Sequence, residues 1–190
     1  TFLIFTRKST KPADKEINTL WSVRVEGGKP INTGLVNIIH FADFIPGTNS
    51  IAYSTVEPRS TSPGWQANND LARYSVTTGE KRKILDASSG GVYGWWGMTF
   101  AFSTDGRLAY ARPDGIGTVD IDGKYLKPLL DITPLNTHSD WAWLPSIVWG
   151  ADNSTLYYVS HAPPPTLVSA EDSPFFDISA TSLDSKATVN

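Results

Sequence analysis

The 190-residue sequence has no cysteine, few charged residues and no long apolar run. The absence of cysteine excludes disulfides, thiolate metal sites and cysteine nucleophiles. Charged residues make up 18% of the chain and the formal net charge is −3, so the sequence lacks the clustered positive surface that binds nucleic acid. The densest basic run, Lys81–Lys83, is interpreted as a solvated strand end. No apolar stretch approaches the roughly 18 residues of a membrane span, so we expect no membrane span in this chain.

Sustained helical spacing of apolar residues is also missing. Turn-forming and aromatic residues are instead abundant: the chain has 15 Gly, 13 Pro, 7 Trp, 7 Tyr and 8 Phe. This mixture favours strands joined by tight turns. An apolar content of 40% is enough to form a core, so the composition predicts a globular β protein.

One hairpin motif occurs three times in the sequence. Each copy has an aromatic residue, a polar turn, and then an apolar strand that ends in tyrosine. Asp105-Gly106 in one copy supplies the positive φ angles of a tight turn, as do glycine and asparagine residues in the others. The copies are Phe44–Tyr53, Phe102–Tyr110 and Trp149–Tyr158.

A second motif alternates apolar and polar residues and then turns. This period of two is typical of a strand that is covered on one face. Its copies are Leu20–Pro30, Leu71–Lys81, Gly117–Lys124 and Phe176–Lys186. Each repeat therefore has four strands, named a to d: hairpin a–b, a connection, then hairpin c–d. The hairpin copies are spaced by 58 and 47 residues, which indicates propeller blades with variable loops.

Two segments carry a family resemblance: FSTDGRLAYAR (102–112) and LWSVRVEGGKP (20–30). They resemble TolB-like, WD40-like (PD40) repeats, although Thr104 stands where that family usually has proline. The resemblance implies an all-β protein: a β-propeller of about 3.5–4 four-stranded antiparallel blades, partial or open. We expect a single domain over residues 1–190, with blades near 1–35, 36–86, 87–131 and 132–190. The first blade begins at strand b and the last ends within strand d, so we expect a piece of a longer propeller.

The resemblance also implies an extracytoplasmic location, periplasmic or at the cell surface. The sequence starts at Thr1 without methionine, and Phe2–Phe5 already has the pattern of a strand. Whether an export signal or lipid anchor precedes it therefore stays open. Incomplete blades expose strand edges and apolar faces, so we expect self-association through open blade edges.

The long connections are expected on one face, because the b–c and d–a connections of a propeller share a side. Most of the tryptophans fall in these connections, whereas Trp21 and Trp149 lie in predicted strands and are interpreted as core. A loop tryptophan either packs between blades or offers a stacking surface for a sugar ring or a peptide. The candidate ligand-binding residues are Trp65, Trp95, Trp96, His138, Asp140, Trp141, Trp143 and His161.

Catalytic and metal motifs are scarce in this sequence. No G-x-S-x-G, P-loop or H-E-x-x-H pattern is present, and no catalytic residue is assigned. His138 and Asp140 are either a loop hydrogen-bond pair or part of a metal site, but a metal needs a third ligand. We therefore predict no metal and no other cofactor. Asp120, Asp122 and the sequon at Asn153 are interpreted as hairpin turns.

These observations favour a non-catalytic binding or scaffolding module. Its ligand would be a protein, a peptide or a glycan on the tryptophan-rich face. Two alternatives stay open. The chain is an accessory, gating propeller of a larger prolyl-oligopeptidase-like hydrolase, or a propeller lyase with a metal at His138 or His161.

Overall fold

The computed structural model describes residues 1–10, 15–38, 41–60, 64–86, 98–124, 126–135, 143–162, 164, 166, 175–183 and 188–189. In these ranges the chain consists of antiparallel strands and turns, and none of them is helical. The described part therefore contains no helix that could span a membrane. The strands belong to two compact units, Thr1–Gly97 and Met98–Asn190.

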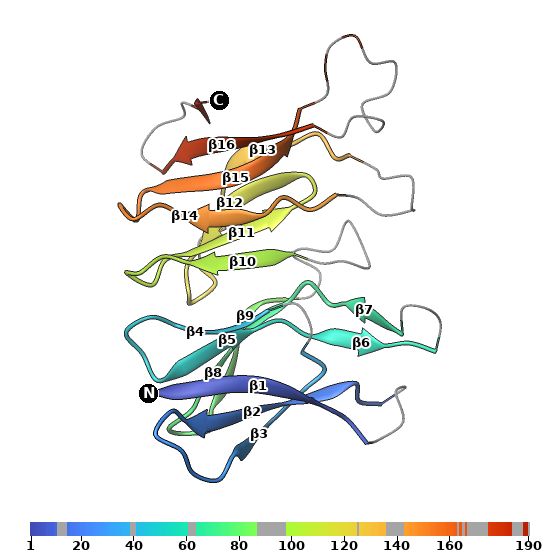
Figure 1. Ribbon diagram of the computed structural model, residues 1–190, viewed down its shortest axis with the longest axis vertical. Helices are drawn as coiled ribbons and strands as arrows, with labels where there is room; N and C mark the ends of the chain where they lie inside the picture. Colours follow the sequence, from blue (N-terminus) through green and yellow to red (C-terminus); the bar gives the residue numbers. More distant parts are fainter. Residues whose placement is uncertain are drawn as a thin grey trace. The chain divides into compact units, whose positions relative to one another are not determined.

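The first unit contains a three-stranded sheet, a four-stranded sheet and a two-stranded hairpin (Figure 1). The three-stranded sheet has the order β1-β2-β3, with β1 (Phe2–Lys8), β2 (Asn18–Arg24) and β3 (Ile31–Val36). The four-stranded sheet has the order β4-β5-β8-β9, with β4 (Ala42–Phe44), β5 (Ser50–Tyr53), β8 (Leu71–Ser75) and β9 (Lys81–Leu85). The hairpin pairs β6 (Val56–Pro58) with β7 (Trp65–Ala67).

The second unit contains two four-stranded sheets (Figure 1). One sheet consists of β10 (Thr99–Phe102), β11 (Leu108–Arg112), β12 (Gly115–Val119) and β13 (Lys127–Asp131). The other consists of β14 (Ile147–Trp149), β15 (Thr155–His161), β16 (Phe176–Ser182) and β17 (Thr188–Val189). The strand order a-b-c-d predicted from the repeat is confirmed in each four-stranded sheet. The first sheet has only b, c and d among the described residues, also as predicted.

The a–b hairpins form where the turn chemistry of the sequence predicts them. Gly106 has a φ of 89° and donates its N–H to the Ser103 carbonyl at 3.1 Å. Asn153 takes the equivalent left-handed position with a φ of 54°, which asparagine tolerates better than most residues. The turn at Asp120–Gly123 closes through the Gly123 N–H and the Asp120 carbonyl, as the hairpin interpretation of these aspartates predicts.

Each unit has its core between its two larger sheets. In the first unit the buried side chains are Leu20, Leu35, Ile38, Ile51 and Tyr53. In the second unit they are Ala109, Ala111, Ile116, Leu156 and Tyr158. Fully burying an aliphatic side chain of this size contributes about 1.5–3 kcal/mol, so these clusters are the main source of sheet-on-sheet stability.

The two predicted core tryptophans differ in the structure. Trp149 packs against the second core, and its Nε1–H donates to the Ala101 carbonyl of the neighbouring sheet at 2.9 Å. Trp21 is half-buried, and the Arg7 guanidinium lies 4.8 Å from its ring centroid. Its Nε1–H donates to the Thr19 hydroxyl at 2.8 Å. The core interpretation is therefore wrong for Trp21, because the side chain lies on the face of β2 that points away from the core.

Candidate functional site

Of the predicted binding residues, Trp65, Trp143 and His161 lie in the described part of the chain. Trp65 belongs to β7 in the first unit, whereas Trp143 and His161 belong to the second unit. The remaining candidates lie outside the described residues: Trp95, Trp96, His138, Asp140 and Trp141. His40, the remaining histidine of the sequence, lies outside them as well.

The second unit brings two predicted residues together through a third aromatic ring. Phe176 is the first residue of β16 and pairs in register with His161, the last residue of β15. The centroids of these two rings are 5.2 Å apart, and the ring planes are tilted by 59°. The Trp143 ring lies 5.4 Å from the Phe176 ring at a tilt of 38°. Trp143, His161 and Phe176 are called the aromatic cluster below.

Backbone hydrogen bonds hold the chain segments that carry this cluster. The Trp143 N–H donates to the Leu135 carbonyl at 2.8 Å, which closes the d–a connection beside β14. The Ala162 N–H donates to the Phe175 carbonyl at 3.1 Å, which extends the β15–β16 ladder past its last pair. Between Trp143 and β14, Pro145 is fully buried and restricts Leu144 to extended conformations. Backbone hydrogen bonds therefore hold both segments of the cluster at the end of the β15–β16 ladder.

The surface of the cluster is apolar and open. Phe175 is 57% exposed and Phe176 is 47% exposed, while Trp143 and His161 are half-buried. Large aromatic side chains are costly to leave in water, and rigid rings bind with little loss of conformational entropy. The Ser160 and Ser179 hydroxyls lie 3.2 Å apart and hydrogen-bond to each other, but they belong to the opposite face of the β15–β16 ladder. The arrangement can bind apolar or aromatic groups by stacking and dispersion.

The structure does not support a metal site at His161. Among the residues that the structure describes, no three His, Asp or Glu side chains are grouped so that they could hold a metal ion. His161 has ring neighbours in the cluster instead. The described residues offer no ligand set of the kind that a metal-dependent lyase requires.

Trp65 lies in a hairpin that the sequence analysis does not predict. The sequence analysis places Trp65 in a long connection, but this part of the chain contains the β6–β7 pair, in which Trp65 is opposite Pro58. The Asp70 carboxylate anchors this hairpin through hydrogen bonds to the residues that precede β6. It accepts hydrogen bonds from the Thr55 N–H at 2.7 Å, the Thr55 hydroxyl at 2.7 Å and the Ser54 hydroxyl at 3.3 Å.

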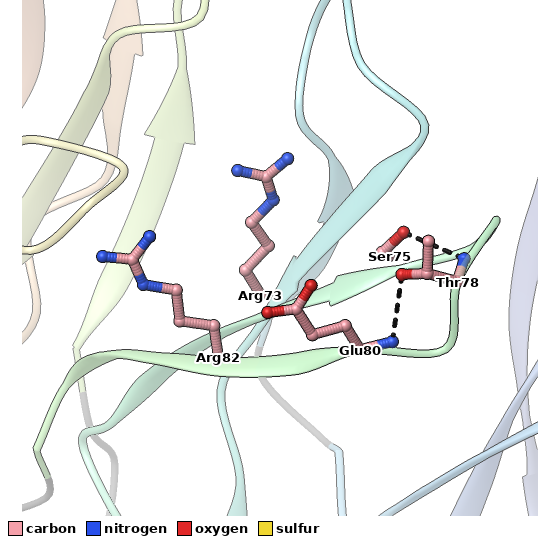
Figure 2. Close-up of a pocket in the computed structure, with 5 residues that line it drawn as sticks. All are labelled: Arg73, Ser75, Thr78, Glu80 and Arg82. Carbon is pink, nitrogen blue, oxygen red and sulfur yellow. Dashed lines mark hydrogen bonds between the residues drawn. The ribbon is translucent and has the colours of Figure 1, made fainter.

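A polar cleft of about 230 Å³ lies on the β8–β9 ladder of the first unit (Figure 2). Arg73 and Arg82 are directly opposite each other in the antiparallel register, and like charges in this position repel. Figure 2 shows both guanidinium groups on the same side of the ladder as the Glu80 carboxylate. The sequence analysis missed this pairing, because it treated 81–83 only as a basic run. The two arginines and Glu80 together carry a formal charge of +1.

Comparisons with known proteins identify the fold. No family model matches the sequence, and no curated protein matches it. The structure is similar to that of TolB from Acinetobacter baumannii, with a TM-score of 0.62 and 14% identity over 98% of this chain and 40% of that chain. It is similar to a nidogen/laminin complex structure, with a TM-score of 0.58 and 13% identity over 100% of this chain and 60% of that chain.

A third similar structure is an acylaminoacyl peptidase from Pyrococcus horikoshii. The TM-score is 0.50 and the identity 14%, over 80% of this chain and 24% of that chain. This chain thus spans 40–60% of the length of the first two structures and a smaller share of the peptidase. At such identities the similarity concerns the fold alone. Together with the four antiparallel sheets, it shows that the chain has an all-β, propeller-type fold.

Proposed function

We propose that this chain is a non-catalytic binding module that recognises a segment of a protein or peptide at the aromatic cluster. The observation that carries the proposal is the juxtaposition of Trp143, His161 and Phe176 beside the exposed Phe175. Trp143 belongs to the d–a connection, and His161 and Phe176 are the strand ends that border the b–c connection of the same sheet. Long connections on a rigid scaffold are the usual place of binding. Aromatic residues also dominate the binding energy of many protein interfaces.

The composition of the cluster favours a protein or peptide over a glycan. Sugar binding requires polar groups around an aromatic platform, since each hydroxyl must exchange its hydrogen bonds with water for others. The Ser160 and Ser179 hydroxyls bond to each other on the opposite face of the β15–β16 ladder from His161 and Phe176, so they supply no polar group beside the rings. The exposed surface is supplied mainly by phenylalanine rings. An apolar or aromatic side chain of a partner fits this surface better than a sugar ring.

The similar structures support the proposal at the level of fold. The TolB structure and the nidogen/laminin complex structure contain a similar fold, and the latter is by its description a protein complex. By the same analogy we propose that the chain belongs to the TolB-like (PD40) repeat family and works outside the cytoplasm.

Selection from a displayed peptide library tests this function. We expect peptides with an aromatic or aliphatic anchor, whose affinity for the chain falls about tenfold or more on Trp143→Ala and on Phe176→Ala. The matched control is Leu126→Ala, which removes an apolar side chain that is 40% exposed on a c–d connection. If both cluster variants keep the affinity of the control for every selected peptide, the proposal is refuted.

A second function is favoured by the peptidase similarity. An accessory propeller that gates a separate hydrolase domain would match a small share of the whole enzyme, as observed for the acylaminoacyl peptidase. The test is the sequence of the full-length protein that contains this chain. A further domain with a G-x-S-x-G motif, active on acyl-peptides, would support it, and a full-length protein without a hydrolase domain would exclude it.

A further inference from the structure

Two arginines lie opposite each other in the β8–β9 hairpin, although the repeat does not require two charges there. Arg73 of β8 pairs with an alanine of strand b on one side and with Arg82 of β9 on the other. Its equivalent in the sheet β10-β11-β12-β13 is Thr118, which also pairs with an alanine of strand b and lies opposite Lys127. Like charges directly opposite each other destabilise a sheet, so the packing of the repeat gives no reason for this pair.

A buried hydroxyl orients the Arg73 side chain. Ser50 is 3% exposed, and its Oγ accepts a hydrogen bond from the Arg73 Nε–H at 3.1 Å. This bond uses one of the guanidinium N–H donors and leaves those on the two terminal nitrogens. Within the part of the chain that the structure describes, Arg73 belongs to none of the ion pairs. The fold therefore positions this guanidinium group without pairing it with a carboxylate.

The cleft beside Arg73 is lined by hydrogen-bond donors. It has a volume of about 230 Å³ and lies between Arg73, Ser75, Thr78, Glu80 and Arg82, which all belong to β8, β9 and the turn that joins them. The Ser75 Oγ accepts from the Thr78 N–H at 3.2 Å, and the Thr78 Oγ1 accepts from the Glu80 N–H at 3.3 Å. Each hydroxyl therefore still has its own hydrogen to donate.

We propose that this cleft binds a carboxylate group, supplied by an acidic side chain of a peptide or by a small organic acid. The planar fork of an arginine matches a carboxylate, to which it donates two parallel hydrogen bonds. The formal charge of +1 on Arg73, Arg82 and Glu80 together is compensated by one carboxylate, whereas a phosphate dianion would leave an excess negative charge beside Glu80. A bound anion also offsets the repulsion between the two arginines.

The proposal goes beyond the binding of an apolar segment at the aromatic cluster. The cleft belongs to the first unit, and the cluster belongs to the second. The cleft selects by charge, and the cluster selects by apolar contact, so the two sites can be tested separately.

Glu80 provides a test of sign. Its carboxylate extends from the same side of the ladder as the two guanidinium groups (Figure 2), and it belongs to no ion pair among the described residues. It repels a bound carboxylate and lowers the net positive charge of the cleft. Removing this charge should therefore strengthen binding, whereas removing either arginine should weaken it. A purely structural role of these side chains would not give opposite signs.

NMR titration of the 190-residue chain tests the site. The observed signals are the Nε–H groups of Arg73 and Arg82 and the backbone amide of Thr78. The ligands are sodium acetate and a blocked tetraglutamate peptide at constant ionic strength, with a blocked tetraglutamine peptide and inorganic phosphate for comparison. We expect both carboxylate ligands to shift these signals, with a dissociation constant on the order of 1 mM for acetate at low salt. Binding should weaken as sodium chloride is added.

The two carboxylate ligands distinguish the sources of the group. An affinity for tetraglutamate at least about tenfold higher than for acetate would identify an acidic peptide segment as the ligand. Equal affinities per carboxylate would identify a small organic acid.

Four variants connect the binding to the named side chains. Arg73→Gln and Arg82→Gln should each weaken acetate binding about tenfold or more, and Glu80→Gln should strengthen it about threefold or more. Because Arg82 is exposed, Arg82→Gln keeps the test valid if Arg73→Gln does not fold. Lys81→Gln is the matched control, since it removes one positive charge from the opposite face of the same strand. It should bind acetate within about twofold of the unmodified chain.

Four results would overturn the proposal. The first is that neither carboxylate ligand shifts the Nε–H signals of Arg73 and Arg82, and the second is that tetraglutamine shifts them as much as tetraglutamate does. The third is that Lys81→Gln weakens binding as much as Arg82→Gln, which would indicate a diffuse positive field instead of a site. The fourth is that phosphate binds more tightly than acetate at the same ionic strength.

Discussion

Replacing Asp70 with alanine should release the β6–β7 hairpin that carries Trp65. The change removes the acceptor of three hydrogen bonds, two of which, from the Thr55 N–H and hydroxyl, are short at 2.7 Å. The third, from the Ser54 hydroxyl, is weaker at 3.3 Å. Hydrogen bonds to a charged group contribute about 1.5–3 kcal/mol each. Since Asp70 is only half-buried, we expect a total loss of about 2–4 kcal/mol.

A loss of this size is measurable in a protein of 190 residues. It corresponds to a fall in melting temperature of about 4–16 °C. Urea unfolding followed by circular dichroism gives the free energy, and hydrogen exchange gives the location. The Thr55 amide, which donates to Asp70, should exchange faster, as should the Asn68 amide, which donates to the Thr55 carbonyl at 3.0 Å.

Glu57→Ala is the matched control in the same hairpin. It also removes a carboxylate, but the Glu57–Arg59 pair at 3.0 Å is exposed on both sides. Exposed pairs contribute about 0–1 kcal/mol, so this variant should be nearly as stable as the unmodified chain. An Asp70→Ala variant as stable as Glu57→Ala, with unchanged exchange at Thr55, would refute the anchoring role of Asp70.

Three further outcomes follow from the packing and the ionisable groups. Gly117→Ala should lower stability by about 1–3 kcal/mol in urea unfolding, because a Cβ there would overlap the buried Tyr110 side chain and the Lys127 backbone carbonyl; Tyr110→Phe removes only the hydroxyl and should leave most of the loss in place. The Thr155 hydroxyl, followed by backbone amides, lowers the pKa of Asp152, so its contribution is present at neutral pH and lost as the pH falls. Asp152→Asn should therefore flatten the acid limb of a stability–pH profile, and an unchanged limb would contradict this. Burial raises the pKa of three tyrosines, so the stability that their neutral forms contribute should be lost as the pH rises above about 10. The expected result is that unfolding coincides with the rise in tyrosinate absorbance. These tyrosines are Tyr53, Tyr110 and Tyr158.

The repeat motifs predict the sheets well because the information is local. Turn residues such as Asp105-Gly106 and Asn153 fix the hairpins, and alternation in segments such as Leu71–Lys81 fixes the covered face. The β6–β7 hairpin escapes prediction because each of its strands has three residues and β6 ends at Pro58. Asp70 bonds to Ser54 and Thr55, which precede β6 and lie 16 and 15 residues earlier in the sequence, so no local pattern reveals this anchor.

The candidate site is only partly contained in the sequence pattern. Trp143 and His161 are selected as loop aromatics, but Phe176 is treated there as a strand residue, although it is the ring that both of them contact. The double phenylalanine at the end of the b–c connection is the signal that could have identified it. Arg73 and Arg82 lie opposite each other because of the register of β8 and β9. Neither composition nor periodicity predicts that register.

The binding role of the aromatic cluster is tested most directly by hydrogen exchange of the chain with and without a selected peptide. Binding at this place should slow exchange around Trp143, at the end of β15 and at the start of β16, and leave the β6–β7 hairpin unchanged. Protection that appears only in β6–β7 or at the c–d connections, with none around Phe176, would contradict the proposed site.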